Sequence, residues 1–189
     1  RVIDHIDALG LRDDTWFILM GDNGWMMGEH GFTSKVLAYE PSIRVPILVA
    51  GPGVRSGVVD ALALNIDLPA TMLEIAGVPV PAAMHGRSLM PIVRGEDVAW
   101  RNDIYYEAPT PALGSQPLAA LRTQRWKYIQ TYPLEAEGDV ASIAFEELYD
   151  LRDDPYELHN LVNDSKQAAR VAEFREHIAA HRKAHESGR

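Results

Sequence analysis

The hydrophobic pattern of the chain changes character near residue 100. Before that point, residues 15–20 and residues 45–50 form continuous apolar runs without alternation. Such runs are typical of strands that are buried on both faces of an α/β sheet. Two helices accompany them, one over the first nine residues and one that begins with Asp67 as its cap and ends at Gly77. We therefore predict that residues 1–99 contain the last strands of a doubly wound sheet.

Beyond residue 100, short runs rich in aromatic and branched residues are separated by turn residues. This pattern predicts a small antiparallel sheet, with Trp126 and its neighbours as packing residues. A long amphipathic stretch predicts a closing helix. We therefore expect an α/β protein in which residues 100–189 form an antiparallel-sheet subdomain with a C-terminal helix. The four predicted strands cover residues 103–107, 118–123, 126–132 and 147–151, and the helix covers residues 165–186.

Composition and charge narrow the possible functions. The chain is 47% hydrophobic, enough for a folded core, and carries a formal net charge of −9, which argues against nucleic acid as a partner. It has no cysteine, so disulfides, a zinc ribbon and a thiol nucleophile are excluded within these residues. Its apolar runs are too short to span a membrane. The chain opens inside a helical pattern without an initiator methionine, which indicates a piece of a longer protein.

The candidate chemistry gathers directly after the first predicted strand. Asp22 and Asn23 lie where open α/β sheets place their ligands, and their side-chain oxygens are donors that Ca²⁺ or Mg²⁺ accepts. Gly21 and Gly24 allow the backbone to bend and to approach a bound group. The same residues also fit a plain tight turn, because Asn-Gly, at 23–24, is a common turn dipeptide.

Other polar residues have more than one interpretation each. Lys35 supplies a compact positive charge for an anionic oxygen, or it is a surface lysine. His30 and His85 are each an acid, a ligand or a packed residue. His177 and His181 lie one helical turn apart without a third ligand candidate, so we predict an exposed helix face. No serine lies in a G-x-S-x-G setting, and no other nucleophile is evident.

The ordered set of motifs resembles the later half of the sulfatases, which belong to the alkaline-phosphatase superfamily. The resemblance covers nearly the whole chain. It rests on the segments Asp-Asn-Gly at 22–24, Gly-Glu-His-Gly at 28–31, Lys35, Tyr-Glu-Pro-Ser-Ile-Arg-Val-Pro at 39–46, Gly-Pro-Gly at 51–53, Asp-Leu-Pro-Ala-Thr at 67–71, Gly-Arg-Ser-Leu at 86–89, Leu-Arg-Thr-Gln-Arg-Trp-Lys-Tyr at 121–128 and Glu-Leu-Tyr-Asp-Leu at 147–151.

This resemblance implies a sulfuric ester hydrolase. Asp22 and Asn23 would be ligands of Ca²⁺, with Mg²⁺ as the second choice, and Lys35 would hold the sulfate oxygens. The nucleophile of the family is a formylglycine made from Cys or Ser in a C/S-x-P-S-R motif, which is absent here. We therefore expect the N-terminal half of the same protein as a partner. The motifs are closest to enzymes for sulfated sugars, of the N-acetylglucosamine-6-sulfatase or mucin-desulfating type, and the family favours a periplasmic, secreted or lysosomal location.

Two other hypotheses share these residues. The first is a phosphonate monoester hydrolase or phosphodiesterase of the same superfamily. The second is a remnant that binds sulfated glycans without cleaving them. The presence together of Asp22, Asn23 and Lys35 favours an enzyme, because drift would have removed at least one of them.

Overall fold

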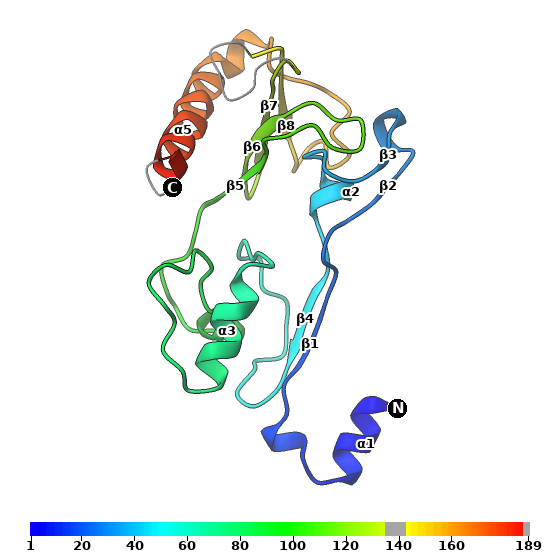
Figure 1. Ribbon diagram of the computed structural model, residues 1–189, viewed down its shortest axis with the longest axis vertical. Coiled ribbons are helices and arrows are strands. Elements are labelled where there is room, and N and C mark those ends of the chain that lie inside the picture. Colours follow the sequence, from blue (N-terminus) through cyan, green and yellow to red (C-terminus); the bar gives the residue numbers. More distant parts are fainter. Residues whose placement is uncertain (135–142, 187–189) are drawn as a thin grey trace. The chain divides into compact units, whose positions relative to one another are not determined.

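The structure is a computed structural model that describes residues 1–134 and 143–186. It divides the chain into two compact units (Figure 1). Unit 1 consists of Arg1–Asp22 and Val45–Arg101, and unit 2 consists of Asn23–Arg44 and Asn102–Arg189. The segment Asn23–Arg44, called the site segment below, therefore groups with the antiparallel sheet. The boundary between residues 99 and 100 stays a prediction.

Unit 1 contains a two-stranded antiparallel ribbon and short helices. Its elements are α1 (Val2–Ala8), the 3-10 helix η1 (Arg12–Asp14), β1 (Phe17–Met20), β4 (Ile47–Ala50), α3 (Asp67–Ile75) and α4 (Met90–Arg94). The strands β1 and β4 pair so that Phe17 lies opposite Ala50. Both were predicted as strands, but the expected burial on two faces is wrong for this chain. Leu19 pairs with Leu48, and they are 67% and 57% exposed, so the face of the ribbon that they share is not covered by the described residues.

The buried carboxylate of Asp67 organises the rest of unit 1. It accepts hydrogen bonds from the backbone N–H groups of Leu64 and Arg87, both at 2.8 Å, and from Nη2 of Arg101 at 2.7 Å. Asp67 is the first helical residue of α3 and Ile66 is the cap, so the prediction that Asp67 caps the helix is wrong. The reason is that its side chain turns to a distant arginine and to the loops around it.

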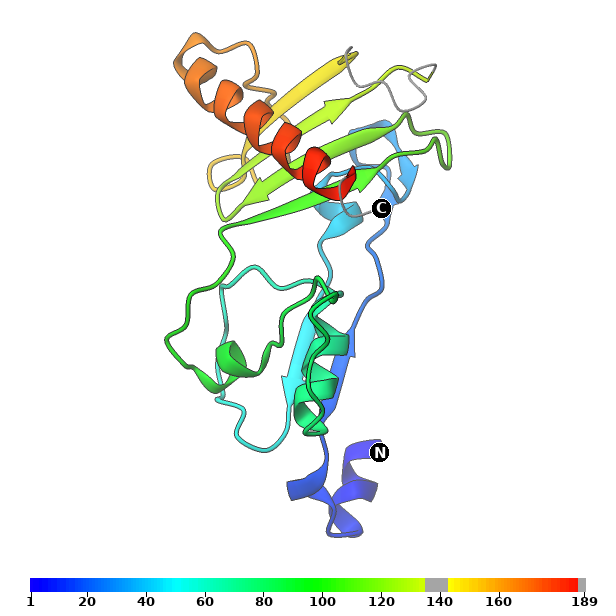
Figure 2. The ribbon, with the colours of Figure 1, turned by 60° about the vertical axis from the view of Figure 1, so that its left-hand side comes forward.

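Unit 2 is built on a four-stranded antiparallel sheet in the order β5-β6-β7-β8. The predicted strands are confirmed within one or two residues. The strands are β5 (Asp103–Ala108), β6 (Leu118–Thr123), β7 (Trp126–Thr131) and β8 (Phe145–Asp150). The predicted closing helix is also present, as the 3-10 turn η3 (Ser165–Gln167) followed by α5 (Ala168–Glu186). Figure 2 shows α5 lying across one face of this sheet.

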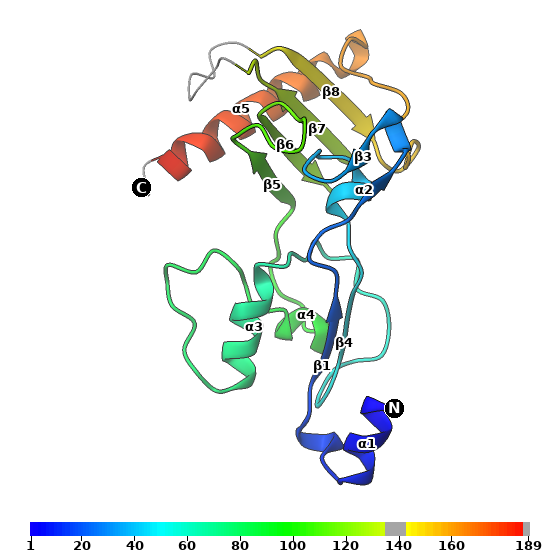
Figure 3. The same ribbon diagram turned by 45° about the vertical axis from the view of Figure 1, so that its right-hand side comes forward.

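Alternation along the strands gives the sheet two different faces. One face packs against Val171, Phe174 and Ile178 of α5, and its own buried residues include Leu121, Tyr128 and Leu148. The other face lies against the site segment, and this apolar cluster contains Leu37, Ala38, Tyr39, Tyr106, Leu118, Ala120, Ile129 and Tyr149. In Figure 3 the site segment, in blue to cyan, lies on the side of the sheet away from α5. The sheet therefore supports the site segment with one face and is itself closed by α5 on the other.

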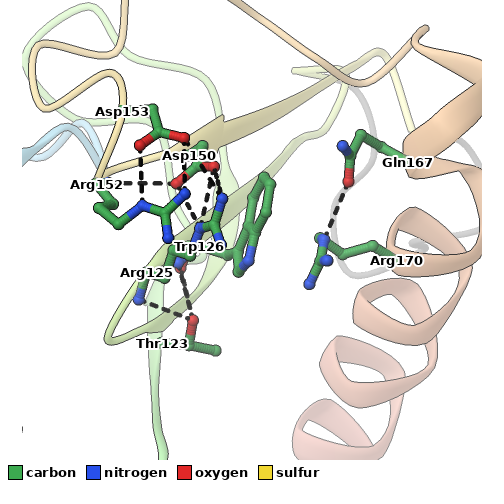
Figure 4. Close-up of polar contacts among 8 residues, drawn as sticks. All are labelled: Thr123, Arg125, Trp126, Asp150, Arg152, Asp153, Gln167 and Arg170. Atoms are coloured by element: carbon green, nitrogen blue, oxygen red, sulfur yellow. Dashed lines mark hydrogen bonds and ion pairs between the residues drawn. The ribbon is translucent and has the colours of Figure 1, made fainter.

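An ionic cluster fixes the turn between β6 and β7 (Figure 4). Nε of Arg125 donates to both carboxylate oxygens of Asp150, at 2.8 and 3.0 Å. The guanidinium of Arg170 lies 3.9 Å from the ring centroid of Trp126, and that of Arg125 lies 4.9 Å from it. Cation–π contacts thus join the start of α5 to the turn.

The far end of α5 also contacts the sheet. The ring of His181 stacks on Tyr105 with centroids 5.0 Å apart and planes 5° apart. Nδ1 of the half-exposed His177 lies 3.9 Å from the Asp103 carboxylate. The predicted exposed face is therefore wrong for His181, because the helix leans that turn onto β5. No helix among the described residues is long and apolar enough to cross a membrane.

Asp150 should stabilise the chain in a pH-dependent way. The Arg125 guanidinium holds the pKa of Asp150 below its usual value. This stability is present above the ordinary carboxyl pKa of about 3.9 and is lost as pH falls through the lowered pKa. We expect Asp150→Asn to lower the thermal midpoint at pH 7, and the difference from wild type to close below about pH 4.

Asp153→Asn is the matched control, since that side chain belongs to the same cluster and is 62% exposed. It should change the midpoint little. Thermal melts over a pH series make both measurements. A difference for Asp150→Asn that persists at acid pH would contradict the ionic explanation.

Candidate active site

The first half of the site segment forms a small hairpin. The strands β2 (Met26–Met27) and β3 (Thr33–Ser34) pair so that Met26 lies opposite Ser34. The 3-10 turn η2 (Glu29–Gly31) forms the tip of this hairpin. This pairing could not be predicted from the sequence, because two-residue strands are too short to show alternation.

The two ends of the site segment meet directly after Asn23. The N–H of Gly24 donates to the carbonyl of Ser42, at 2.8 Å. A Cβ atom at Gly24 would lie 2.1 Å from the carbonyl oxygen of Pro41, so only glycine permits this approach. Pro41 and Ser42 belong to the short helix α2 (Glu40–Ile43). This hydrogen bond holds Asn23 beside α2, near the C-terminal end of the site segment.

The structure brings Lys35 and Asn23 together. Nζ of Lys35 donates to Oδ1 of Asn23 at 3.0 Å, across 12 residues of sequence. Asp22 precedes Asn23 in the chain as the last residue of unit 1, and its carbonyl accepts from Nδ2 of Asn65 at 3.3 Å. Two of the three predicted site residues therefore share a hydrogen bond, and the third is joined to them by a peptide bond.

Lys35 lies between two residues with unusual backbone. Ser34 has φ 99° and Val36 has φ 88°. This region disfavours residues with a side chain, and a branched residue such as valine most of all. Such strain persists only where the surroundings hold it, and it gathers at functional sites. The pairing of Ser34 with Met26 holds one side of Lys35, and the hydroxyl of Tyr106 donates to the Val36 carbonyl at 2.6 Å on the other.

A buried ionic cluster ties the second half of the site segment to the sheet. Lys127 of β7 is fully buried, with Nζ 2.8 Å from Oε1 of Glu40 and 2.7 Å from Oε1 of Glu157. Both contacts of Lys127 Nζ are ionic ones outside hydrogen-bond geometry. Nη2 of Arg122 lies 3.3 Å from Oε2 of Glu40, and the N–H of Glu40 donates to Oε2 of Glu157 at 2.7 Å. We call these four residues the Lys127 cluster.

The pKa shifts of the two acids follow from this environment. Burial raises the pKa of Glu157, and the nearby Lys127 opposes that rise. Burial acts on Glu40 in the same direction, but Lys127 and Arg122 outweigh it and leave the pKa of Glu40 below its usual value. Glu40 is thus a stable anion at neutral pH, fixed between two cations.

His30 has a defined structural place. Its ring stacks on Tyr39 with centroids 4.0 Å apart and planes 10° apart. The Tyr39 hydroxyl donates to Oε1 of Glu147 at 2.7 Å, and the same oxygen accepts from Tyr149 at 2.6 Å. Burial and the Glu147 carboxylate raise the pKa of Tyr39 well above its usual value, so it remains a donor. His30 therefore packs against an anchored ring, whereas the exposed His85 lies in unit 1.

The donor set at Asp22 and Asn23 fits a hard cation in kind but not in number. A carboxylate and an amide oxygen are the ligands that Ca²⁺ accepts, and it takes roughly 6–8 of them. The part of the chain that the structure describes contains no group of three or more His, Cys, Asp or Glu residues able to hold a metal. Further ligands would have to come from other residues.

A family model described as "N-sulphoglucosamine sulphohydrolase, C-terminal" matches residues 28–184. An N-acetylglucosamine-6-O-sulfatase of Bacteroides thetaiotaomicron is 30% identical over 181 residues, which is 92% of this chain and 31% of that protein. A choline-sulfatase of Rhizobium meliloti is 32% identical over 187 residues, which is 96% of this chain and 34% of that protein. The chain thus spans about a third of the length of these relatives.

A solved structure agrees over nearly the whole chain. It is a complex with its substrate D-glucosamine-2-N,6-O-disulfate, and it superposes with a TM-score of 0.84 at 28% sequence identity. The match covers 99% of this chain and 38% of that one.

The Lys127 cluster should dominate the stability of unit 2. Lys127→Met leaves two buried carboxylates with less compensation, and breaking a buried pair in this way costs about 3–5 kcal/mol. Urea unfolding at pH 7 measures the loss. Lys166→Met, at an exposed position, is the control and should leave the free energy of unfolding nearly unchanged.

Adding Glu157→Gln to Lys127→Met should recover part of the loss, since it removes one of the stranded charges. If Lys127→Met is as stable as wild type, the cluster does not anchor the site segment.

Proposed function

Since the chain belongs to the sulfatase family, as the family model matching most of its length shows, we propose that it is the C-terminal part of a sulfuric ester hydrolase. The observation that carries the proposal is the Lys35 ammonium at 3.0 Å from the Asn23 amide oxygen, on a backbone strained on both sides of the lysine. A folded protein tolerates such strain where it fixes a side chain for use.

In this proposal Lys35 binds the oxygens of the sulfate group. A sulfate ester carries negative charge on its oxygens, and this charge grows as the bond to the leaving group breaks. A fixed ammonium that faces these oxygens stabilises the transition state more than the ground state. Lys35 is suited to this role because it presents a compact charge with three donors.

Asp22 and Asn23 are proposed ligands of Ca²⁺, with Mg²⁺ as the second choice. A bound cation would supply further positive charge beside the sulfate oxygens. The hydrogen bond from Lys35 uses one lone pair of the Asn23 amide oxygen and leaves the second for a metal. The nucleophile is proposed to be a formylglycine in the N-terminal half of the same protein, since these residues include no cysteine and no suitable serine.

The proposed substrates are sulfated sugars. The N-acetylglucosamine-6-O-sulfatase and the complex with a disulfated glucosamine support this class. The choline-sulfatase relative marks the alternative of a small sulfated alcohol. A location in the periplasm, outside the cell or in the lysosome would fit such substrates.

The substrate class is tested with the full-length enzyme on four compounds. These are glucosamine 6-sulfate, choline sulfate, an aryl sulfate and an aryl phosphate diester. Turnover of the sugar and aryl sulfates supports the proposal. Preference for the diester would show a phosphodiesterase, and binding of sulfated sugar without turnover would show a glycan-binding protein.

Replacing Lys35 in the full-length enzyme should abolish most of the activity. Loss of one fixed donor at developing negative charge lowers the rate on the order of 10²–10³-fold. Lys35→Arg should also be impaired, because a planar guanidinium does not replace a compact ammonium. Steady-state kinetics on an aryl sulfate measure both variants, with thermal melts as the folding test.

Lys166→Ala is the matched control at an exposed position and should retain wild-type kinetics. An unchanged kcat/KM in Lys35→Ala would remove Lys35 from the site.

Calcium should bind weakly to the chain of 189 residues by itself. Two oxygen ligands fall well short of the roughly 6–8 that Ca²⁺ takes, so we expect a millimolar Kd or no detectable heat. Titration calorimetry on wild type and Asp22→Ala makes the test. Micromolar binding that survives Asp22→Ala would show that the ligands lie elsewhere.

A further inference from the structure

We propose that Tyr106 is a positioning residue for Lys35, acting through the carbonyl of Val36. The inference rests on the proposed function, in which Lys35 binds the sulfate oxygens. Its basis is the hydrogen bond of 2.6 Å from the Tyr106 hydroxyl to the Val36 carbonyl, 70 residues away in sequence.

Tyr106 is itself well fixed. It lies on β5, where it pairs with Ala120 of β6, and its ring packs in the apolar cluster under the site segment. Burial raises the pKa of Tyr106, so the hydroxyl keeps its proton and remains a donor at neutral pH. The hydroxyl is therefore a rigid donor that extends from the sheet to the segment.

The backbone around Lys35 needs such a contact. Val36 has φ 88°, a conformation that a branched residue does not hold unaided. The β2–β3 pairing fixes Ser34 on the other side of Lys35, so the lysine lies between two anchored residues. Without the Tyr106 hydroxyl, the peptide after Val36 is free to turn, and the lysine loses one of its two anchors.

The neighbouring Tyr105 provides a matched comparison. It lies on the opposite face of β5, where its hydroxyl donates to Oε2 of Glu107 at 2.8 Å and its ring stacks on His181. Both tyrosines are partly buried, and replacement by phenylalanine removes the hydroxyl contact with Glu107 in one case and with Val36 in the other. Only the contact of Tyr106 leads to the backbone beside Lys35.

The test is a double-mutant cycle in the full-length enzyme with 4-nitrophenyl sulfate as substrate. The variants are Tyr106→Phe, Tyr105→Phe, Lys35→Ala and the pair Lys35→Ala with Tyr106→Phe. We expect Tyr106→Phe to lower kcat/KM about 10- to 100-fold, because a small misplacement of a binding group has an effect of this size. The inhibition constant of inorganic sulfate should rise in the same variant, and Tyr105→Phe should leave both values unchanged.

The double variant separates positioning from general destabilisation. If Tyr106 acts through Lys35, then Tyr106→Phe has no further effect once Lys35 is alanine, within about twofold. A multiplied loss in the double variant would overturn the inference, and so would wild-type kinetics of Tyr106→Phe beside an impaired Lys35→Ala. That last outcome would leave the proposed function intact. Wild-type kinetics of Lys35→Ala would instead refute the assigned role of Lys35, and the inference with it.

Discussion

The ammonium of Lys127 has no access to water, and the rest of unit 2 is arranged around that constraint. A buried charge is tolerated only where opposite charges surround it. Glu40 and Glu157 supply them, and Arg122 balances the second carboxylate, so two acids face two bases. Because Glu40 begins α2, this balance can be reached in one register only. Any shift of the site segment along the sheet would bury an unmatched charge.

The two faces of the sheet have different roles in unit 2. The face toward α5 has an apolar centre that packs the four strands together, with Gln130, Glu146 and Asp150 in polar contacts around it. The opposite face mixes apolar residues with Lys127, Glu147 and Tyr106, each of which reaches the site segment through a polar contact. The site segment contributes Leu37, Ala38 and Tyr39 to the apolar cluster on this face, and the polar contacts fix where these residues lie. The face toward α5 thus contributes packing, and the opposite face contributes both packing and the ionic contacts of the Lys127 cluster.

Local patterns predicted the strands of unit 2 and the closing helix well, since those elements follow from alternation and amphipathicity. Asn23 and Lys35 were also predicted from the sequence as site residues, and the structure joins them by a hydrogen bond. The anchors were not found. Lys127 was predicted to pack in the sheet beside Trp126, but its ion pairs with Glu40 and Glu157 were not predicted, because these partners lie far away in sequence. The roles of Tyr106 and Val36 were equally hidden, since neither the hydrogen bond nor the positive φ has a local signal.

The arrangement of unit 2 also governs the order in which it can form during synthesis. The chain enters unit 2 at Asn23, leaves it at Arg44 and returns only at Asn102. The backbone N–H of Glu40 donates to the side chain of Glu157, and 117 positions of sequence separate the two residues. At roughly 5–20 residues per second, the ribosome needs about 6–23 s to span that interval. Until β5, β6 and β7 emerge, the site segment has no sheet to lie on, and its bond to Glu157 forms only after β8 has been made as well.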